Sequence, residues 1–400
     1  MSSTADEPNR HDQPLPANRE SLSERYRRLR RERWRRRRER WHWRHLLRGR
    51  VRPLLAACLA GVLLGIGGTA WQTQAGPFAP DEVCWGALSR ADLAPMFREP
   101  DHVKVVEAPV LRGSGPMDGP VGSCQLTNSD GDAWALTARV HRLDDRAGDD
   151  GQWADEFLSA RLTPLGGGLL GMASDNRAWL AVPDGCLGRP GEFDGPTVVD
   201  IAQGTWISDQ EPRTEERDGM ARMVVKLVNK VSADLGCAGT IADPVERLPK
   251  AARYIRTEKP DALCGIKGLT LGKKRKPSKY PMITAGDGPV RTCDRDLTGS
   301  QWKQRMMTVE DPRLAAIFTG MALNEGDRVS STVGYGGLGP NLGVFQARCQ
   351  AGPTVFLVQA NDGGMSADLR TLFPRYVESE AARLGCGPLK LRLPGPGGGR

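Results

Sequence analysis

The strongest constraint on the fold is a pattern that occurs twice along the chain, each time with cysteines at matching places. The segment "DGPVGSC" at residues 118–124 returns as "DGPVRTC" at residues 287–293. A shift of 149 residues then superposes two later segments that end in "LGC", at residues 235–237 and 384–386. Self-similarity of this kind indicates a duplicated unit, so both copies are expected to have the same fold.

The segment before each "LGC" motif has the spacing of an amphipathic helix. Apolar residues recur three and four positions apart, which places them along one face of a helix. The glycine that follows suits the left-handed conformation that ends many helices. Pro374 falls opposite Val225 and is expected to kink or restart the second helix. In the first copy the superposed positions are Met220, Met223, Val224, Leu227, Val228, Leu235, Gly236 and Cys237. Their counterparts in the second copy, in the same order, are Leu369, Leu372, Phe373, Tyr376, Val377, Leu384, Gly385 and Cys386.

Other landmarks recur in the same order within each copy. A tryptophan on an expected strand, Trp134 or Trp302, is followed by a short helical segment, a glycine-rich loop and a strand that leads to the third cysteine. A further strand comes next, at residues 196–203 or 353–360. The fold class predicted is α+β, with two tandem homologous units, each a mainly antiparallel sheet with a C-terminal amphipathic helix.

Eight cysteines lie in the duplicated part, and an even number is typical of disulfides in an oxidising compartment. Duplication reduces the possible connectivities because each unit then pairs its own four cysteines, although several remain open. The favoured pattern joins a helix end to a neighbouring strand in each case. It pairs Cys84 with Cys124, Cys186 with Cys237, Cys264 with Cys293, and Cys349 with Cys386.

An apolar run at residues 53–71 contains no charged residue. At 1.5 Å per residue, about 18 helical residues reach across the hydrocarbon part of a bilayer. We therefore predict one transmembrane helix at residues 54–71. Cleavage near Ala75 is an alternative, and Cys58 in "LAAC" resembles a lipoprotein box, although most of the apolar run follows that cysteine.

The positive charge of the chain is concentrated before this helix. Residues 1–52 contain 17 Arg and no Lys against 7 acidic residues, so the rest of the chain is close to neutral. A cationic block resists translocation, which keeps the N-terminus in the cytoplasm and places the duplicated part outside. The block at residues 21–52 is expected to meet anionic lipid headgroups, and no nucleic-acid partner is expected.

A second basic stretch lies in the second unit. It is a possible contact for an anionic wall polymer, an envelope protein or lipid headgroups, although a solvated loop is the plainer interpretation. Its charged residues are Lys273, Lys274, Arg275, Lys276 and Lys279.

Motifs that carry chemistry are weak in this sequence. Residues 166–171 and 334–339 both fit G-x-G-x-x-G, but strand-like sequence follows each, whereas a dinucleotide site needs a helix there, so turns or bulges are expected. The acidic stretches at residues 128–134 and 144–151 lack the spacing of a calcium loop. No nucleophile motif accompanies His102 or His141. We expect no catalytic residue, metal or cofactor.

The cysteine order resembles that of the small bridged extracytoplasmic domains of actinobacterial lipoproteins and kinase sensor regions. The likeness covers residues 80–390 and the bias toward Arg, Ala, Gly and Pro also suits it. This resemblance implies ligand sensing or envelope association without a defined catalytic activity.

The predicted organisation is a single-pass type II membrane protein. Its function is expected to be extracytoplasmic binding, sensing or scaffolding in the cell envelope. The alternatives are a wall-active or hydrolytic envelope enzyme, and a secreted binding protein after cleavage. The segments are a disordered cytoplasmic tail (1–20), a basic juxtamembrane helix (21–52), the transmembrane helix (54–71), extracytoplasmic unit 1 (80–240), extracytoplasmic unit 2 (260–390) and a disordered tail (391–400).

Overall fold

A computed structural model of the chain describes Arg30 and residues 81–113, 119–128, 135–144, 153–191, 194–204, 211–256, 258–270, 280–295, 303–361 and 366–393, except the side chains of 366–368. The described residues from 81 onward belong to one compact unit, Ala79–Arg400, which is separate from residues 1–78. The predicted cytoplasmic tail, basic segment, transmembrane helix and cleavage position lie outside the described residues, apart from the helical Arg30. Within the described ranges, no helix is long and apolar enough to cross a bilayer.

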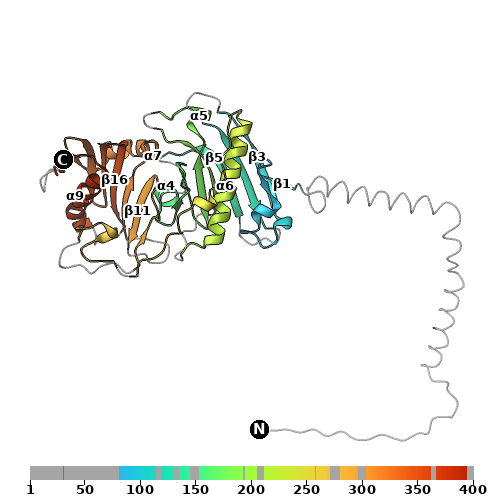
Figure 1. Cartoon of the computed structure of the whole chain (residues 1–400), viewed down its shortest axis with the longest axis horizontal. Coiled ribbons are helices and arrows are strands. Elements are labelled where there is room, and N and C mark those ends of the chain that lie inside the picture. Colours follow the sequence, from blue (N-terminus) through green and yellow to red (C-terminus); the bar gives the residue numbers. More distant parts are fainter. Residues whose placement is uncertain are drawn as a thin grey trace, which may run out of the picture. The chain divides into compact units, whose positions relative to one another are not determined.

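Two seven-stranded antiparallel sheets form the framework of the compact unit Ala79–Arg400 (Figure 1). The first sheet has the order β3-β4-β5-β9-β8-β7-β6, and the second has the order β10-β11-β12-β16-β15-β14-β13. If the strands of each sheet are counted along the chain, both orders become 1-2-3-7-6-5-4. The predicted α+β class is confirmed, and the repeated topology supports a duplication.

The strand bounds of the first sheet are Lys104–Leu111 (β3), Val121–Thr127 (β4), Ala135–Arg142 (β5), Thr163–Pro164 (β6), Gly171–Ala173 (β7), Arg177–Ala181 (β8) and Thr197–Gln203 (β9). Those of the second sheet are Met282–Ile283 (β10), Val290–Arg295 (β11), Gln304–Val309 (β12), Asp327–Ser330 (β13), Gly334–Leu338 (β14), Leu342–Cys349 (β15) and Gly352–Ala360 (β16). A small ribbon of Glu82–Val83 (β1) and Leu88–Ser89 (β2) precedes them.

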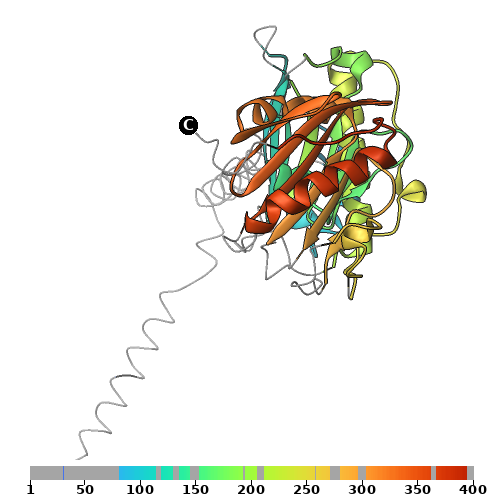
Figure 2. The ribbon, with the colours of Figure 1, turned by 90° about the vertical axis from the view of Figure 1, so that its left-hand side faces the viewer.

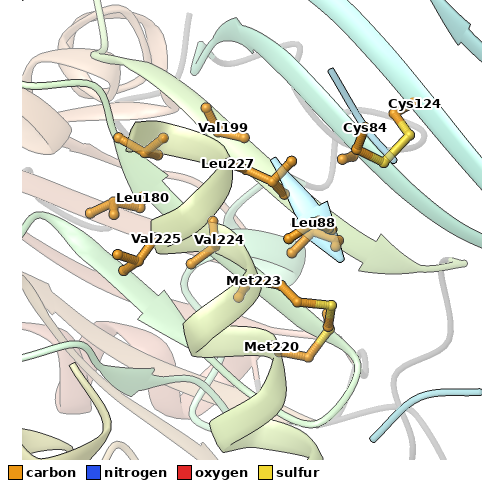
Figure 3. Close-up of a cluster of buried hydrophobic side chains, with 14 of the residues drawn as sticks. Cys84, Leu88, Cys124, Leu180, Val199, Met220, Met223, Val224, Val225 and Leu227 are labelled. Atoms are coloured by element: carbon orange, nitrogen blue, oxygen red, sulfur yellow. A yellow bond between two sulfur atoms is a disulfide. The ribbon is translucent and has the colours of Figure 1, made fainter. Parts of the chain in front are cut away.

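A long helix covers the outer face of each sheet, as the apolar spacing predicts. Helix α6 (Thr214–Asp234) buries Met223, Val224 and Leu227 against the first sheet (Figure 3). Helix α9 (Ser366–Arg383) crosses the second sheet in the same way (Figure 2). Gly236 and Gly385, which follow the two helices, have φ of 75° and 65°, so both take the left-handed conformation expected of them.

Three local expectations are corrected by the structure. Pro374 lies inside α9 and does not restart it, because apolar side chains on both sides of the proline dock on the sheet. Cys186 lies in the short helix α5 (Asp184–Leu187) and not on a strand. Residues 334–338 form strand β14 and not a loop, since a Cβ at Gly336 would collide with the backbone of Val344 and only glycine permits this approach.

The inner faces of the two sheets share one apolar core. The short helices α4 (Trp153–Phe157), α7 (Pro312–Ile317) and α8 (Thr319–Asn324) contribute to the layer between the sheets, and Figure 1 shows α4 and α7 there. The rings of Trp153 and Phe318, from the two copies, lie 4.9 Å apart. The layers therefore run α6, first sheet, short helices, second sheet, α9.

Coverage on both faces explains the sequence of the central strands. In β9, Val198 belongs to the core shared by the two sheets, whereas Val199 packs under α6. In β16, Leu357 faces the shared core and Val358 packs under α9. A strand that is buried on both faces needs consecutive apolar residues and loses the simple alternation of a half-exposed strand.

A buried charged group ties α4 to the second sheet. The fully buried Arg305 on β12 donates to Asp294 on β11 and to Asp155 on α4. Asp294 also accepts from the backbone N–H of Ala160 at 3.1 Å. A buried arginine depends on such partners, because the loss of one of them leaves an uncompensated charge in the interior.

The four disulfides follow the expected pairing. Their Cα–Cα distances lie between 4.0 and 5.8 Å. Cys84 and Cys264, the first cysteines of the two copies, have φ of 52° and 53°. Such a conformation is uncommon for cysteine, so its presence in both copies is a further sign of duplication. The pairs are Cys84–Cys124, Cys186–Cys237, Cys264–Cys293 and Cys349–Cys386.

The docking of α6 is tested by Leu227→Ala. Leu227 is fully buried, so its truncation is expected to lower the free energy of unfolding by about 2–5 kcal/mol. Leu323→Ala on α8 is the matched control, since Leu323 is 53% exposed and its loss should cost less than about 0.5 kcal/mol. Urea unfolding followed by circular dichroism measures both, and equal effects would contradict the packing of α6.

The charged group between the copies is tested by Asp294→Ala. This change leaves the buried Arg305 with one carboxylate fewer and is expected to lower the free energy of unfolding by about 3–5 kcal/mol. Asp327→Ala is the control, because the Asp327–Arg370 ion pair is solvent-exposed and should contribute less than about 1 kcal/mol. A loss at Asp294 no larger than the loss at Asp327, in the same unfolding assay, would contradict the buried arrangement.

Candidate binding cleft

A cleft of about 980 Å³ lies between the first half of the compact unit (residues 81–240) and its second half (residues 260–393). The first half lines it with residues that follow β8, namely Asp184, Arg189, Pro190, Gly191 and Asp194. The second half lines it mainly from α7, α8 and the inner face of its sheet, with Arg313, Thr319, Tyr335, Gln346, Arg348 and Pro353 among the contributors.

One wall of the cleft is a segment that only the first copy contains. Residues 182–196 connect β8 to β9, whereas the equivalent strands β15 and β16 are joined directly by Gln350 and Ala351. The disulfide Cys186–Cys237 ties this connection to the end of α6. Gly195 lies against Ile317 and Leu143 so closely that a Cβ there would collide with both. The described residues of the insertion are therefore held at both ends, by the disulfide and by the contact of Gly195 with the second half.

The second wall follows from the register of the second sheet. Tyr335 on β14 lies opposite Gln346 on β15, so both side chains are on the same face. Val344, two residues earlier on β15, belongs to the shared core, and Arg348 lies two residues later. Since side chains alternate along a strand, Val344, Gln346 and Arg348 all face inward. The cleft is the outer continuation of the shared core, beyond the point where apolar side chains fill it.

An ion pair joins the two walls. Arg313 on α7 contacts Asp184 of the insertion at 3.2 Å and Asp311 at 2.9 Å. Asp311 also caps α7, because its carboxylate accepts from the backbone N–H of Arg313 at 2.9 Å. The hydrogen bonds to Asp311 raise the pKa of Arg313, despite the opposing effect of burial. Asp194 contacts Arg142 of β5 at 3.1 Å.

Two arginines of the cleft differ from these. Within the described residues, neither Arg189 on the insertion nor Arg348 on β15 has a side-chain hydrogen bond or ion pair, and both side chains are exposed. Nearby, the carboxamide oxygen of Gln346 accepts from Tyr335 Oη at 2.8 Å and from Thr319 Oγ1 at 3.4 Å. This arrangement leaves the amide nitrogen of Gln346 as a hydrogen-bond donor toward the cleft.

The described lining holds few groups that are free for acid–base or nucleophilic chemistry. The three carboxylates among the described lining residues, Asp184, Asp194 and Asp311, are each paired with an arginine. Each of them is therefore already engaged by a guanidinium group. Among the described lining residues there is no serine, cysteine or histidine to act as a nucleophile or base.

Some of the candidate sites named from the sequence lie outside the described residues, and others are turns or strands. Lys273, Lys274, Arg275, Lys276 and Lys279 lie outside the described residues, as do residues 129–134 and 145–151 of the acidic stretches. Residues 166–168 form a turn with positive φ, and strand β7 follows them where a dinucleotide site needs a helix. Residues 334–338, in the other segment with this glycine pattern, are themselves a strand, so the helix that a dinucleotide site needs is missing there as well.

One group in the structure has the composition of a metal site. Glu258, Cys264 and Cys293 lie close together and buried. The two cysteines, however, are bridged to each other, so they have no thiolate to offer a metal ion. Glu258 is instead paired with the buried Arg295 at 2.7 Å. We interpret this group as structural.

His141 belongs to a second buried charged group, in the first half. Its Nε2 lies 3.0 Å from Asp200 and its Nδ1 lies 2.9 Å from the carbonyl oxygen of Arg142. Both ring nitrogens thus face acceptors, which favours the protonated ring. Asp200 is also paired with Arg177 at 3.1 Å, and Arg177 with Glu156 at 2.5 Å. All charges here have partners, so the group serves the fold.

Comparison with known proteins does not place the chain in a family. No family model, curated protein or solved structure matches it.

The cleft residues were not found from the sequence. Arg189 and Arg348 belong to no motif and lie far apart along the chain, and Tyr335 lies in the glycine-rich segment at residues 334–339, which was considered only for nucleotide binding. One signal was available, because the insertion between β8 and β9 has no counterpart in the second copy. A segment that one copy of a duplication gains and anchors with a disulfide is a reasonable place to look for function.

The charge on His141 is tested by measuring how its contribution to the free energy of unfolding changes with pH. Burial lowers the pKa of His141, but the hydrogen bond and charge of Asp200 outweigh it, so the pKa lies above its ordinary value of 6.5. A raised pKa in the folded state adds stability that is fully present below pH 6.5. This stability is lost as the pH rises through the pKa that His141 has in the folded state. His141→Gln should therefore cost more stability in acid than in alkaline buffer.

Chemical unfolding across pH measures this difference between His141→Gln and the native chain. His102→Gln is the control, because the His102–Glu99 pair is exposed on both sides and should contribute little at any pH. A cost at His141 that is independent of pH would contradict the charged form of the ring.

Proposed function

We propose that this chain is a membrane-anchored protein of the cell envelope that binds a ligand in the cleft between its two bridged halves. The observation that carries the proposal is the cleft itself, lined by both halves and formed by an insertion of one copy. A binding site that two halves build together is common at such junctions, where a rigid framework holds loops in place.

The proposed location has independent support from the cysteines. All eight cysteines of the compact unit lie in four disulfides. Disulfides in this number are typical of proteins outside the reducing cytoplasm. The apolar run at residues 54–71 and the arginines before it then supply the anchor and its orientation, with the N-terminus inside. A sensing or scaffolding protein would bind its ligand in the same cleft, and only the effect of that binding would differ.

A hydrolytic role has less support. It requires a carboxylate that can give up a proton to a leaving group, or a nucleophile with a base beside it. The carboxylates of the described cleft are held in ion pairs with Arg142 and Arg313. Binding without chemistry is the function that this lining favours.

The location is tested by counting free thiols in the full chain. Protein taken from native membranes is denatured without reductant and treated with a maleimide, and mass spectrometry counts the labels. We expect one label before reduction, on Cys58, and labels on all 9 cysteines after reduction. Mapping of disulfide-linked peptides should return the four pairs within their halves.

Protease added to intact cells supplies the control for orientation. Cleavage within residues 80–390 should need no lysis, whereas the N-terminal segment should become accessible only after lysis. Free thiols on the eight paired cysteines, or protection of residues 80–390 in intact cells, would refute the proposed location.

A further inference from the structure

The cleft has more positive charge available than its composition suggests. Asp184 and Asp311 share Arg313, and Asp194 is paired with Arg142 from outside the lining. The described cleft is therefore left with two guanidinium groups without partners, Arg189 on one wall and Arg348 on the other. An arginine forms paired hydrogen bonds with carboxylate or phosphate, and these are among the stronger contacts available in water.

The surroundings of Arg348 offer polar and aromatic contacts to the rest of a ligand. Tyr335 is 39% exposed and shares the inward face with Arg348 and Gln346. An aromatic ring at the wall of an open cleft suits the face of a sugar ring. The amide nitrogen of Gln346 and the hydroxyl groups of Thr319 and Tyr335 are suited to its hydroxyl groups.

The same wall offers little to an extended peptide. Peptides that add a strand need an open sheet edge. The strands that line the described cleft are β14, β15 and β16, and each of them is paired on both sides within the sheet. Tyr335 is also the one large apolar side chain that is exposed among the described lining residues.

We propose that the cleft binds an acidic saccharide, a sugar that carries a carboxylate or a phosphate. This proposal rests on the binding function proposed above and names its class of ligand. Arg189 and Arg348 contact the anionic group from opposite walls, and Tyr335 packs on the ring. Because the two arginines belong to different halves, the shared core and the ion pair Arg313–Asp184 hold the site in shape.

Hydrogen exchange of the full chain, read by mass spectrometry, tests this proposal at the cleft itself. A site-specific readout is needed because the arginines at residues 21–52 attract any anion. The probes are a short oligogalacturonate, its uncharged methyl ester, a phosphorylated oligosaccharide and oligoglutamate. We expect oligogalacturonate or the phosphorylated oligosaccharide to protect residues 182–191 and Leu342–Cys349, and the ester to protect neither.

Variants identify the residues responsible. Arg189→Gln and Arg348→Gln are each expected to raise the half-saturating concentration of the acidic saccharide about tenfold, through loss of charged hydrogen bonds. Arg375→Gln is the matched control, since Arg375 is exposed on α9, on the other side of the second sheet. Arg189 and Arg348 are exposed, so the unfolding of both variants should match that of the native chain.

The outcomes separate this inference from the proposed function. Protection of the cleft by the methyl ester as strong as by the acid would overturn the role of charge. Stronger protection by oligoglutamate would make the ligand an acidic peptide and overturn the saccharide. Protection of the cleft by none of the acidic probes would also overturn the inference, whereas the envelope location is decided by the thiol count and the protease experiment.

Discussion

The apolar layer between the two sheets is the contact on which the rest of the structure depends. It gathers Trp153 and Phe157 from one copy and Leu314, Ile317 and Phe318 from the other, and it covers the inner faces of both sheets. Without it, each sheet would expose one apolar face to water, since its long helix covers only the opposite face. The two copies therefore fold as one body, although each has its own outer core under α6 or α9.

The cleft is a consequence of where this shared layer ends. Along β15 the inward side chains change from Val344 in the core to Gln346 and then to Arg348 at the opening. The insertion after β8 forms the facing wall, tied by the Cys186–Cys237 disulfide and by the Asp184–Arg313 ion pair. The second copy has no such insertion, so one wall of the cleft comes from a difference between the copies. Function in a duplicated fold is expected to arise at such differences.

The fold was more predictable than the site. Period and spacing identified the apolar faces of α6 and α9, and the repeated order of cysteines favoured the four pairs that the structure contains. These signals are local or depend on self-comparison of the sequence. The errors arose where a tertiary contact overrides a local preference. Packing on the second sheet carries α9 through Pro374, and close strands turn the glycines at residues 334–338 into β14.

The sequence by itself determined the α+β class, the duplication and the helix faces, and it favoured the pairing of the cysteines without deciding it. It also predicts an anchor and its orientation, because hydropathy and charge depend on composition over a short window. Only the tertiary structure decided that the two copies share a core, and that Arg189 and Arg348 line the same cleft without a partner among the residues that the structure describes. The reason is physical. Whether an arginine is paired depends on which carboxylates reach it in space, and residues so far apart in the chain meet only after both sheets have packed together.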